Sequence, residues 1–257
     1  MSGRRGIPFV VSAPSGTGKT TVCRAVVECD EQVEFSISHA TRPRRPGEQD
    51  GVHFHFVSAE VFAERVAAGG FVEHAEYAGN QYGTSWESID EPLAAGRDLL
   101  LEVEVQGARQ LRSRRDDARL VFLLPPSWRE LESRLRGRGT DSEEAIAKPL
   151  ETAHVELAAV HQFDYAVVND SADEATQALL AIIHAERSDA TADVRERFGR
   201  ARVVEGLKGV LPIPGRSCGG GSGYQSSGGL ISQLQAPTPD ASVSLGSQAS
   251  ASSEKSR

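Results

Sequence analysis

A glycine-rich segment near the start of the chain constrains its fold more than any other feature. The segment runs from Ser12 to Thr20, follows the short apolar run 7–11 and precedes a pattern typical of a helix. Gly16 and Gly18 allow backbone conformations that turn successive N–H groups toward one point, at which the positive end of the following helix is also aimed. A strand, a loop of this kind and a helix, in that order, form the P-loop that binds nucleotide phosphates. The sequence therefore predicts an α/β fold built around a phosphate-binding loop.

The residue types within this loop have separate chemical roles. Lys19 is expected to reach the β- and γ-phosphates of ATP, and the hydroxyl of Thr20 is expected to bind Mg²⁺. Ala13 stands where the strict pattern has glycine, but the strand and the helix around the loop are kept. An ordinary turn rich in glycine and serine is disfavoured by the G-x-G-K-T pattern in this context. The predicted ATP-binding residues of the loop are Ala13, Pro14, Ser15, Gly16, Thr17, Gly18, Lys19, Thr20 and Thr21.

The charge and the cysteine content exclude several classes of protein. With a formal net charge of −8, the chain of 257 residues is not expected to bind nucleic acid. Its three cysteines show neither metal-ligand spacing nor an even disulfide framework, which indicates a reducing compartment. No apolar run approaches the roughly 18 residues of a membrane-spanning helix. We therefore expect a cytoplasmic protein without a membrane partner.

Strand and helix patterns alternate along most of the chain, which predicts a parallel core sheet with helices on both faces. The expected strands are 7–12, 99–105, 119–124 and 165–169. The expected helices are 18–29, 58–68, 86–95, 106–114, 127–136, 142–161 and 171–187. The alternation breaks between Phe35 and Tyr82, where segments 54–57 and 71–77 have the pattern of exposed antiparallel strands. An inserted β-rich subdomain is expected at that point.

These patterns divide the chain into a short N-terminal extension, one large domain and a tail. The extension is 1–6 and the domain is 7–207, with a core of 7–34, 83–125 and 162–190, an insertion of 35–82 and a lid at about 126–161. The tail, 208–257, becomes dominated by glycine and serine. We expect the tail to be disordered, because it cannot bury enough apolar surface to offset its ordering entropy.

The order of motifs from about Ile7 to Arg187 resembles that of guanylate kinases. Many NTPases share a P-loop, whereas this ordered set is specific. The matching segments are 12–20, 36–48, 71–75, 79–85, 102–108, 134–139 and 168–170. The resemblance implies the fold of the P-loop nucleoside monophosphate kinases, with a GMP-binding insertion and a helical lid that carries arginines. It also implies a Mg²⁺-dependent transfer of the γ-phosphoryl group of ATP to GMP, and to dGMP, in purine nucleotide metabolism.

The insertion carries the residues expected to bind GMP. Arg42 and Arg45 lie in a loop fixed by prolines, and guanidinium forks bind a phosphate monoester bidentately. The resemblance adds Ser38, Tyr82 and the position of Phe54 to this phosphate site.

The resemblance assigns the recognition of guanine to Glu73 and Thr84. A carboxylate accepts hydrogen bonds from N1–H and from the exocyclic amine of guanine, whereas N1 of adenine is itself an acceptor. We therefore expect GMP to be preferred over AMP, which disfavours a kinase for another nucleoside monophosphate.

Catalysis is assigned by the resemblance to four cations, Lys19, Arg42, Arg134 and Arg138. Guanidinium groups that close over the γ-phosphoryl group neutralise charge on the transferring oxygens. The same resemblance places Asn169 near the adenine of ATP.

Two carboxylates lie at the end of an expected central strand. Glu102 and Glu104 are two residues apart, which predicts that both point to one face, and ligand sites fall at this end of parallel strands. One carboxylate is expected to place the hydration shell of Mg²⁺, and the other is expected to approach GMP. We assign Glu102 to the metal and Glu104 to GMP, although the sequence leaves open which does which.

Two positions depart from the resembling family. Phe54 stands where the family usually has a tyrosine that binds the GMP phosphate, and Pro149 stands where an arginine usually binds phosphate. Proline inside a helix removes a donor, so a bent lid is expected. The alternative function is a catalytically impaired module of the same fold that binds partner proteins, and the intact Lys19 and Thr20 argue against it.

Overall fold

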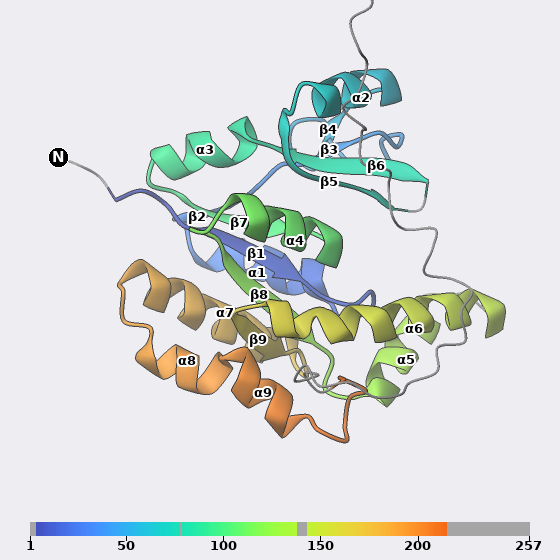
Figure 1. Cartoon of the computed structure of the whole chain (residues 1–257), viewed down its shortest axis with the longest axis vertical. Coiled ribbons are helices and arrows are strands. Elements are labelled where there is room, and N and C mark those ends of the chain that lie inside the picture. Colours follow the sequence, from blue (N-terminus) through green and yellow to red (C-terminus); the bar gives the residue numbers. More distant parts are fainter. Residues whose placement is uncertain (1–3, 78, 138–142, 215–257) are drawn as a thin grey trace, which may run out of the picture. The chain divides into compact units, whose positions relative to one another are not determined.

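The computed structural model describes residues 4–77, 79–137 and 143–214 of the chain. Arg138 and the expected disorder of 215–257 lie outside these residues. Within them, a five-stranded sheet has the strand order β2-β7-β1-β8-β9, and every pair in it is parallel. Its strands are β1 (Pro8–Ser12), β2 (Val33–Phe35), β7 (Asp98–Glu102), β8 (Arg119–Leu124) and β9 (Tyr165–Val168). This sheet is the expected parallel core (Figure 1).

The helices cover both faces of this core, as the sequence predicts, except α2, which packs against the insertion (Figure 1). They are α1 (Lys19–Cys29), α2 (Ala59–Ala67), α3 (Glu87–Ala94), α4 (Val105–Arg114), α5 (Trp128–Arg136), α6 (Glu143–Leu157), the 3₁₀ helix η1 (Ala158–Gln162), α7 (Ala172–Arg187), α8 (Ala192–Phe198) and α9 (Arg200–Gly206). Alternate residues of β1 face opposite ways: Phe9 and Val11 pack with α1 and α7, and Val10 packs with α3, α4 and η1. Because both faces are covered, all five residues of β1 are buried.

A second sheet forms the expected β-rich insertion. Its strands are β3 (His39–Ala40), β4 (His55–Phe56), β5 (Phe71–Tyr77) and β6 (Asn80–Ser85), in the order β4-β3-β6-β5. Strands β5 and β6 pair antiparallel, and Phe62 of α2 stacks on Phe71 with ring centroids 4.5 Å apart. Strand β6 continues to Ser85, beyond the boundary expected at residue 82.

Helix α4 lies between the two sheets and holds the insertion to the core (Figure 1). The side-chain amide of Gln110 accepts from the main-chain N–H of His74 at 3.1 Å and donates to its carbonyl at 2.8 Å. One turn further along the helix, Arg114 donates hydrogen bonds to the carbonyls of Phe71 and Val72 at 2.9 and 2.7 Å. The strand that carries Glu73 is therefore anchored to the core by its main chain.

Several boundaries differ from the sequence-based expectation. Strand β2 was not expected because its three residues are too few to show a period, and it extends the core to Phe35. Strand β7 ends at Glu102 instead of continuing to residue 105, so Glu104 lies beyond the end of the strand. Helices α8 and α9 were not expected either, and α6 continues through Pro149.

The expectation that the tail begins at residue 208 is also wrong. Leu211 is buried and packs against the core, together with the partly buried Ile213. His161 Nε2 lies 2.8 Å from the carbonyl oxygen of Pro214. The folded unit therefore includes the segment 208–214.

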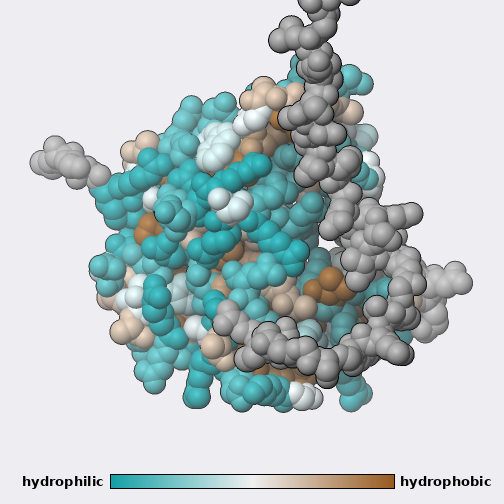
Figure 2. All heavy atoms as spheres, in the orientation of Figure 1, coloured by the Kyte–Doolittle hydropathy of each residue, from teal (hydrophilic) through white to brown (hydrophobic). Residues whose placement is uncertain are grey.

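Hydrophilic residues cover most of the face shown in Figure 2. The large apolar side chains that are exposed among the described residues are single valines from separate segments, Val52, Val61, Val155 and Val210. In the same part of the chain, none of the helices is long and apolar enough to cross a membrane. Apolar side chains therefore serve mainly the core, and the functional residues have to be sought in the cavities.

Candidate phosphoryl-transfer site

The P-loop is confirmed as a strand, a loop and a helix. Strand β1 ends at Ser12, and α1 begins at Lys19 after Gly18, whose φ is 93°. Gly16 also has a positive φ, of 89°. A Cβ atom at Gly18 would lie 2.7 Å from Nδ2 of Asn169, and one at Gly16 would lie 2.9 Å from Leu135. Both glycines are therefore required by backbone conformation and by close packing.

The P-loop is braced from behind by two of the predicted site residues. The carbonyl of Thr17 accepts a hydrogen bond from Asn169 Nδ2 at 2.6 Å and one from Arg134 Nη1 at 3.4 Å. Arg134 also donates to the carbonyl of Asn169 at 3.1 Å and forms an ion pair with Glu130 at 2.8 Å. The structure thus brings both predicted residues to the P-loop, where their recorded partners are carbonyl groups and a carboxylate.

At the start of α1, Lys19 and Thr20 each contact a carboxylate at the strand ends of the core. Lys19 Nζ donates to the carbonyl of Val103 at 2.9 Å and lies 3.3 Å from Glu104 Oε1. Thr20 Oγ1 donates to Glu102 Oε1 at 2.5 Å. Burial acts to lower the pKa of Lys19, but Glu104 and Glu102 outweigh it and leave that pKa raised. Lys19 is therefore a firmly protonated ammonium group.

These two carboxylates reach the P-loop from different elements. Glu102 ends β7, whereas Glu104 is the residue that precedes α4. Glu104 still has an extended backbone, with φ −77° and ψ 163°, so both side chains point toward the start of α1, as expected from their spacing of two residues. Both carboxylates contact the P-loop, Glu102 through Thr20 and Glu104 through Lys19.

The basic loop of the insertion forms a closed group around Arg42. Its guanidinium forms two parallel bonds to the carboxylate of Glu48, at 2.7 and 2.6 Å. It lies 5.0 Å from the ring centroid of Phe54 and 5.4 Å from that of Phe56. Phe54 in turn meets Tyr82 edge to face, with centroids 6.0 Å apart. The phenyl ring of Phe54 thus supports Arg42 and, having no hydroxyl, offers no donor to a phosphate.

Glu48 was not predicted from the sequence as a site residue. The signal that could have found it is a carboxylate six positions after an arginine, across a turn that contains two prolines and Gly47. Gly47 has a φ of 86°, which favours glycine at that turn.

A buried carboxylate lies opposite this loop. Glu73 is 5% exposed and accepts a hydrogen bond from Thr84 Oγ1 at 2.5 Å, while Ser38 Oγ lies 3.1 Å from the same hydroxyl. Burial raises the pKa of Glu73, and the hydrogen bond from Thr84 opposes that rise. A Cβ atom at Gly107 of α4 would lie 2.5 Å from Glu73 Oε2. Gly107 therefore makes room for this carboxylate.

One cavity of about 600 Å³ joins these groups. It is lined by the predicted residues Lys19, Thr20, Ser38, Arg42, Arg45, Phe54, Glu73, Tyr82, Glu102 and Glu104. Arg24 of α1, which was not predicted, also lines it. Lys19 of the P-loop and the carboxylate of Glu73 thus line the same space, although they come from the core and the insertion.

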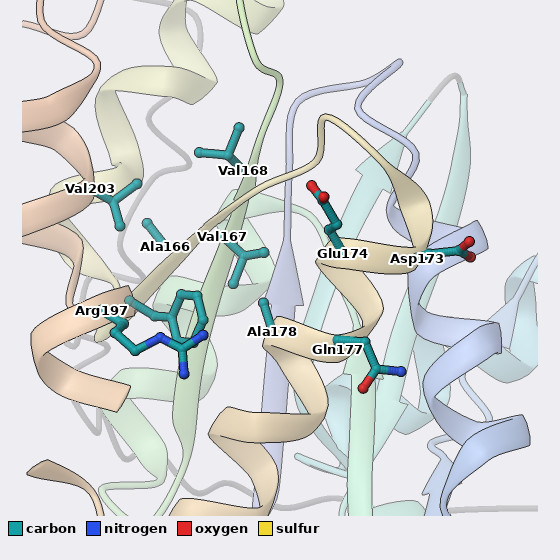
Figure 3. A pocket seen from close by; sticks show the side chains of 10 residues that line it. Ala166, Val167, Val168, Asp173, Glu174, Gln177, Ala178, Arg197 and Val203 are labelled. Atoms are coloured by element: carbon teal, nitrogen blue, oxygen red, sulfur yellow. The ribbon is translucent and has the colours of Figure 1, made fainter. Parts of the chain in front are cut away.

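A second cavity, of about 570 Å³, lies against β9, α7, α8 and α9 (Figure 3). Its wall combines apolar side chains such as Val167 and Ala178 with the charged Glu174 and Arg197. None of the predicted site residues lines this cavity among those that the structure describes. We therefore place the chemistry in the first cavity.

The oxygen atoms of Thr20 and Glu102 are the side-chain groups here that fit Mg²⁺. They lie 2.5 Å apart beside the P-loop lysine, and Mg²⁺ prefers hard oxygen ligands. No group of three or more His, Cys, Asp or Glu side chains in residues 4–77, 79–137 and 143–214 is arranged to hold a metal ion. A metal here would need ligands from nucleotide and water, which is usual for Mg²⁺ in phosphoryl-transfer sites.

Comparisons with known proteins agree with this geometry. The family model described as guanylate kinase matches residues 5–186. A guanylate kinase of Syntrophotalea carbinolica is 47% identical over 197 residues, which cover 77% of this chain and 93% of that protein. A guanylate kinase of Frankia casuarinae is 53% identical over 174 residues, which cover 68% of this chain and 95% of that protein.

A solved structure gives the same result. The crystal structure of guanylate kinase from Anaplasma phagocytophilum superposes with a TM-score of 0.58 at 27% identity, and the match covers 82% of this chain and 97% of that one. Residues 5–186, which the family model matches, include the P-loop, both sheets and α4. The chain belongs to the guanylate kinase family.

Proposed function

We propose that this chain transfers the γ-phosphoryl group of ATP to GMP or dGMP, with Mg²⁺, through the residues of the first cavity. The observation that carries this proposal is that one cavity holds both Lys19 of the P-loop and the buried Glu73 of the insertion. The first group suits a triphosphate and the second suits a guanine base. Two substrates in one cavity can meet without water between them.

Glu73 and Thr84 would read the base. The carboxylate of Glu73 would accept from N1–H and from the exocyclic amine of guanine. The single hydroxyl proton of Thr84, which goes to Glu73 in the free protein, would turn to O6 when the base binds. Adenine would leave acceptors facing each other in a buried site. Selection of GMP over AMP follows from this unpaired arrangement.

Arg42 and Arg45, with Ser38 and Tyr82, would hold the phosphate of GMP. That phosphate is largely ionised near neutral pH, so its oxygen is already a nucleophile. No general base is therefore required, and catalysis consists of positioning and charge neutralisation.

Lys19 would neutralise the β- and γ-phosphates, within a loop whose carbonyl of Thr17 is already held by Arg134 and Asn169. Thr20 and Glu102 would hold Mg²⁺, directly or through water. When bound, the metal would supply positive charge between the β- and γ-phosphates. Arg138 is assigned to the transferring group by family resemblance alone, and Glu104 is assigned to GMP.

The test is a coupled assay of ADP formation with GMP, dGMP, AMP, UMP and CMP as acceptors. We expect turnover with GMP and dGMP and little with the others. Lys19→Ala is expected to abolish transfer while calorimetric titration still detects GMP, since the two phosphate groups are bound from different sheets. Turnover of that variant within a few-fold of wild type would contradict the role of the P-loop.

A further inference from the structure

Glu48 is a charged side chain of the cavity to which the mechanism above gives no role. Its carboxylate binds three donors of the basic loop: Nη1 and Nη2 of Arg42, at 2.7 and 2.6 Å, and the main-chain N–H of Arg45, at 2.8 Å. The main-chain N–H of Glu48 donates a hydrogen bond to the carbonyl of Arg45 at 3.1 Å. The loop is thus closed on itself through one carboxylate.

The pair leaves Arg42 with a fixed orientation. Its guanidinium is 9% exposed, lies beside the rings of Phe54 and Phe56, and also donates to the carbonyl of Pro43 at 3.0 Å. A guanidinium has five N–H donors, and these three bonds leave two, which a ligand can share with the neighbouring hydroxyl of Tyr82. Arg42 can therefore bind a phosphate without giving up Glu48.

The side chain of Arg45, in contrast, is not held in a fixed orientation. Its main chain is bound to Glu48, whereas its guanidinium has no recorded hydrogen bond or ion pair with any described residue and lines the cavity. Glu48 thus fixes the backbone from which a free cation extends. Glu48 thus holds the guanidinium of Arg42 but only the main chain of Arg45.

A carboxylate this close to a phosphate site would weaken anion binding if it acted only by its charge. The hydrogen bonds from Arg42 lower the pKa of Glu48 to about 2, so the group is ionised near neutral pH. The net effect of Glu48 on phosphate affinity is therefore a balance between two contributions. Its negative charge repels the phosphate, whereas its hydrogen bonds fix the positions of Arg42 and Arg45. Because Glu48 accepts three hydrogen bonds from the loop, one of them from the main chain, we expect the second contribution to be larger.

We propose that Glu48 is a positioning residue that forms the phosphate site of GMP before the substrate arrives, by holding Arg42 and the turn at Arg45. This inference rests on the proposed function, because it concerns the phosphate of the same acceptor. Glu48 acts through the arginines and does not touch the reacting atoms.

The experiment compares Glu48→Gln with wild type in steady-state kinetics and in calorimetric titrations with GMP and guanosine. Glutamine keeps the size of the side chain. Its NH₂ group, however, is a donor and would face an N–H donor of Arg42, so one of the two parallel hydrogen bonds is lost. We expect the KM for GMP to rise about tenfold, as for the loss of one charge-assisted bond, with the KM for ATP unchanged. Guanosine has no phosphate, so its affinity is expected to stay the same.

Glu34→Gln is the matched control. Glu34 forms a similar ion pair with Arg97 at 2.5 Å, outside the cavity. We expect this variant to keep the wild-type KM for GMP. In an Arg42→Ala background, Glu48→Gln is expected to weaken GMP by less than it does alone, because the shared partner is gone.

Three outcomes would overturn the inference. An unchanged KM for GMP in Glu48→Gln would show that the arginines need no support. A lower KM would show that Glu48 competes with the phosphate, and an equal loss of guanosine and GMP affinity would show general damage to the insertion. If wild type itself does not bind GMP, the proposed function fails instead.

Discussion

Gly107 shows how one missing side chain shapes a site made by others. It lies on α4, and a Cβ atom there would come within 2.5 Å of Glu73 Oε2. Gly107→Ala is therefore expected to push the carboxylate of Glu73 away from its bond with Thr84. We expect the KM for GMP to rise about tenfold or more, as for the loss of a charge-assisted bond, while the KM for ATP changes little.

The control for this variant is Gly206→Ala at the end of α9. A Cβ atom at Gly206 meets nothing within 4 Å, so the same change of residue type occurs without a collision. Its KM for GMP is expected to equal that of wild type. If Gly107→Ala also leaves this constant unchanged, Glu73 does not read the base in the position observed.

Single residues differ in how well the sequence predicted them. Lys19, Thr20 and Glu73 were found because each belongs to a motif with a fixed order along the chain. Glu48 and Gly107 were not, because each acts on a partner that only the folded loop or the packing of α4 against β5 brings near. For Arg134, the sequence predicted the neighbourhood, but the bond to the P-loop carbonyl depends on how α5 is placed.

Among the elements, α6 contains a residue that normally interrupts a helix. Pro149 lies in the interior of α6, where it contributes no N–H and leaves the carbonyl four residues earlier without a helical partner. Pro149→Ala is expected to raise the melting temperature, since an interior proline costs about 3 kcal/mol relative to alanine.

Pro149→Arg separates this effect from chemistry. Both variants restore the N–H group, but only arginine adds the guanidinium that the resembling family has at this position. We expect both to raise the melting temperature and only Pro149→Arg to raise kcat. Equal kcat values for the two variants would show that no guanidinium is needed there.

Helix α6 also carries a carboxyl group that titrates in an unusual range. Burial, with a smaller effect of Glu104, raises the pKa of Glu156 to about 7, although Lys19 and the N–H of Ser15 oppose the rise. The buried Oε2 atom has no recorded hydrogen-bond partner among the described residues. The folded protein therefore holds a proton on Glu156 that the unfolded chain releases at lower pH.

This shift has a definite sign. Because the folded pKa lies above the usual 4.5, the contribution of Glu156 to stability is complete below about pH 4.5 and is lost as the pH rises toward about 7. Glu156→Gln removes the titration, so we expect it to raise the melting temperature at pH 8 and to leave it nearly unchanged at pH 4.5. Thermal melts across this range check the prediction, and an equal difference at both pH values would contradict it.

Longer elements were predicted better than short ones. Helices α1 and α7 and strand β8 agree with the expected bounds to within one residue, because their apolar periods are long or bounded by polar residues. Strand β2 and helices α8 and α9 are three and seven residues long, and such lengths hold too few periods to be recognised. The order of the strands in each sheet is set by contacts distant in sequence, and the resemblance to the family supplied what periodicity could not.

At the scale of the whole molecule, the described residues contain a complete hydrophobic core. The buried apolar residues extend from Phe9 to Leu211. A chain ending at Pro214 is therefore expected to keep the melting temperature and the turnover of the full chain. A chain ending at Leu207 is the matched comparison, and it is expected to melt at a lower temperature because it lacks Leu211 and Ile213, which pack on the core.

These truncations also test the boundary between the domain and the tail. If the chain ending at Pro214 melts several degrees lower than the full chain, residues 215–257 contribute to stability. If the chain ending at Leu207 is as stable as the longer one, Leu211 adds nothing to the core.

The contacts of α4 with β5 have a consequence beyond catalysis. Strand β5 is the outermost strand of its sheet, and the free main-chain groups of such strands are templates for pairing with another molecule. Gln110 and Arg114 occupy four of these groups, at Phe71, Val72 and His74. The side chains that hold the strand carrying Glu73 thus occupy main-chain groups that would otherwise be open to pairing with a strand of another molecule.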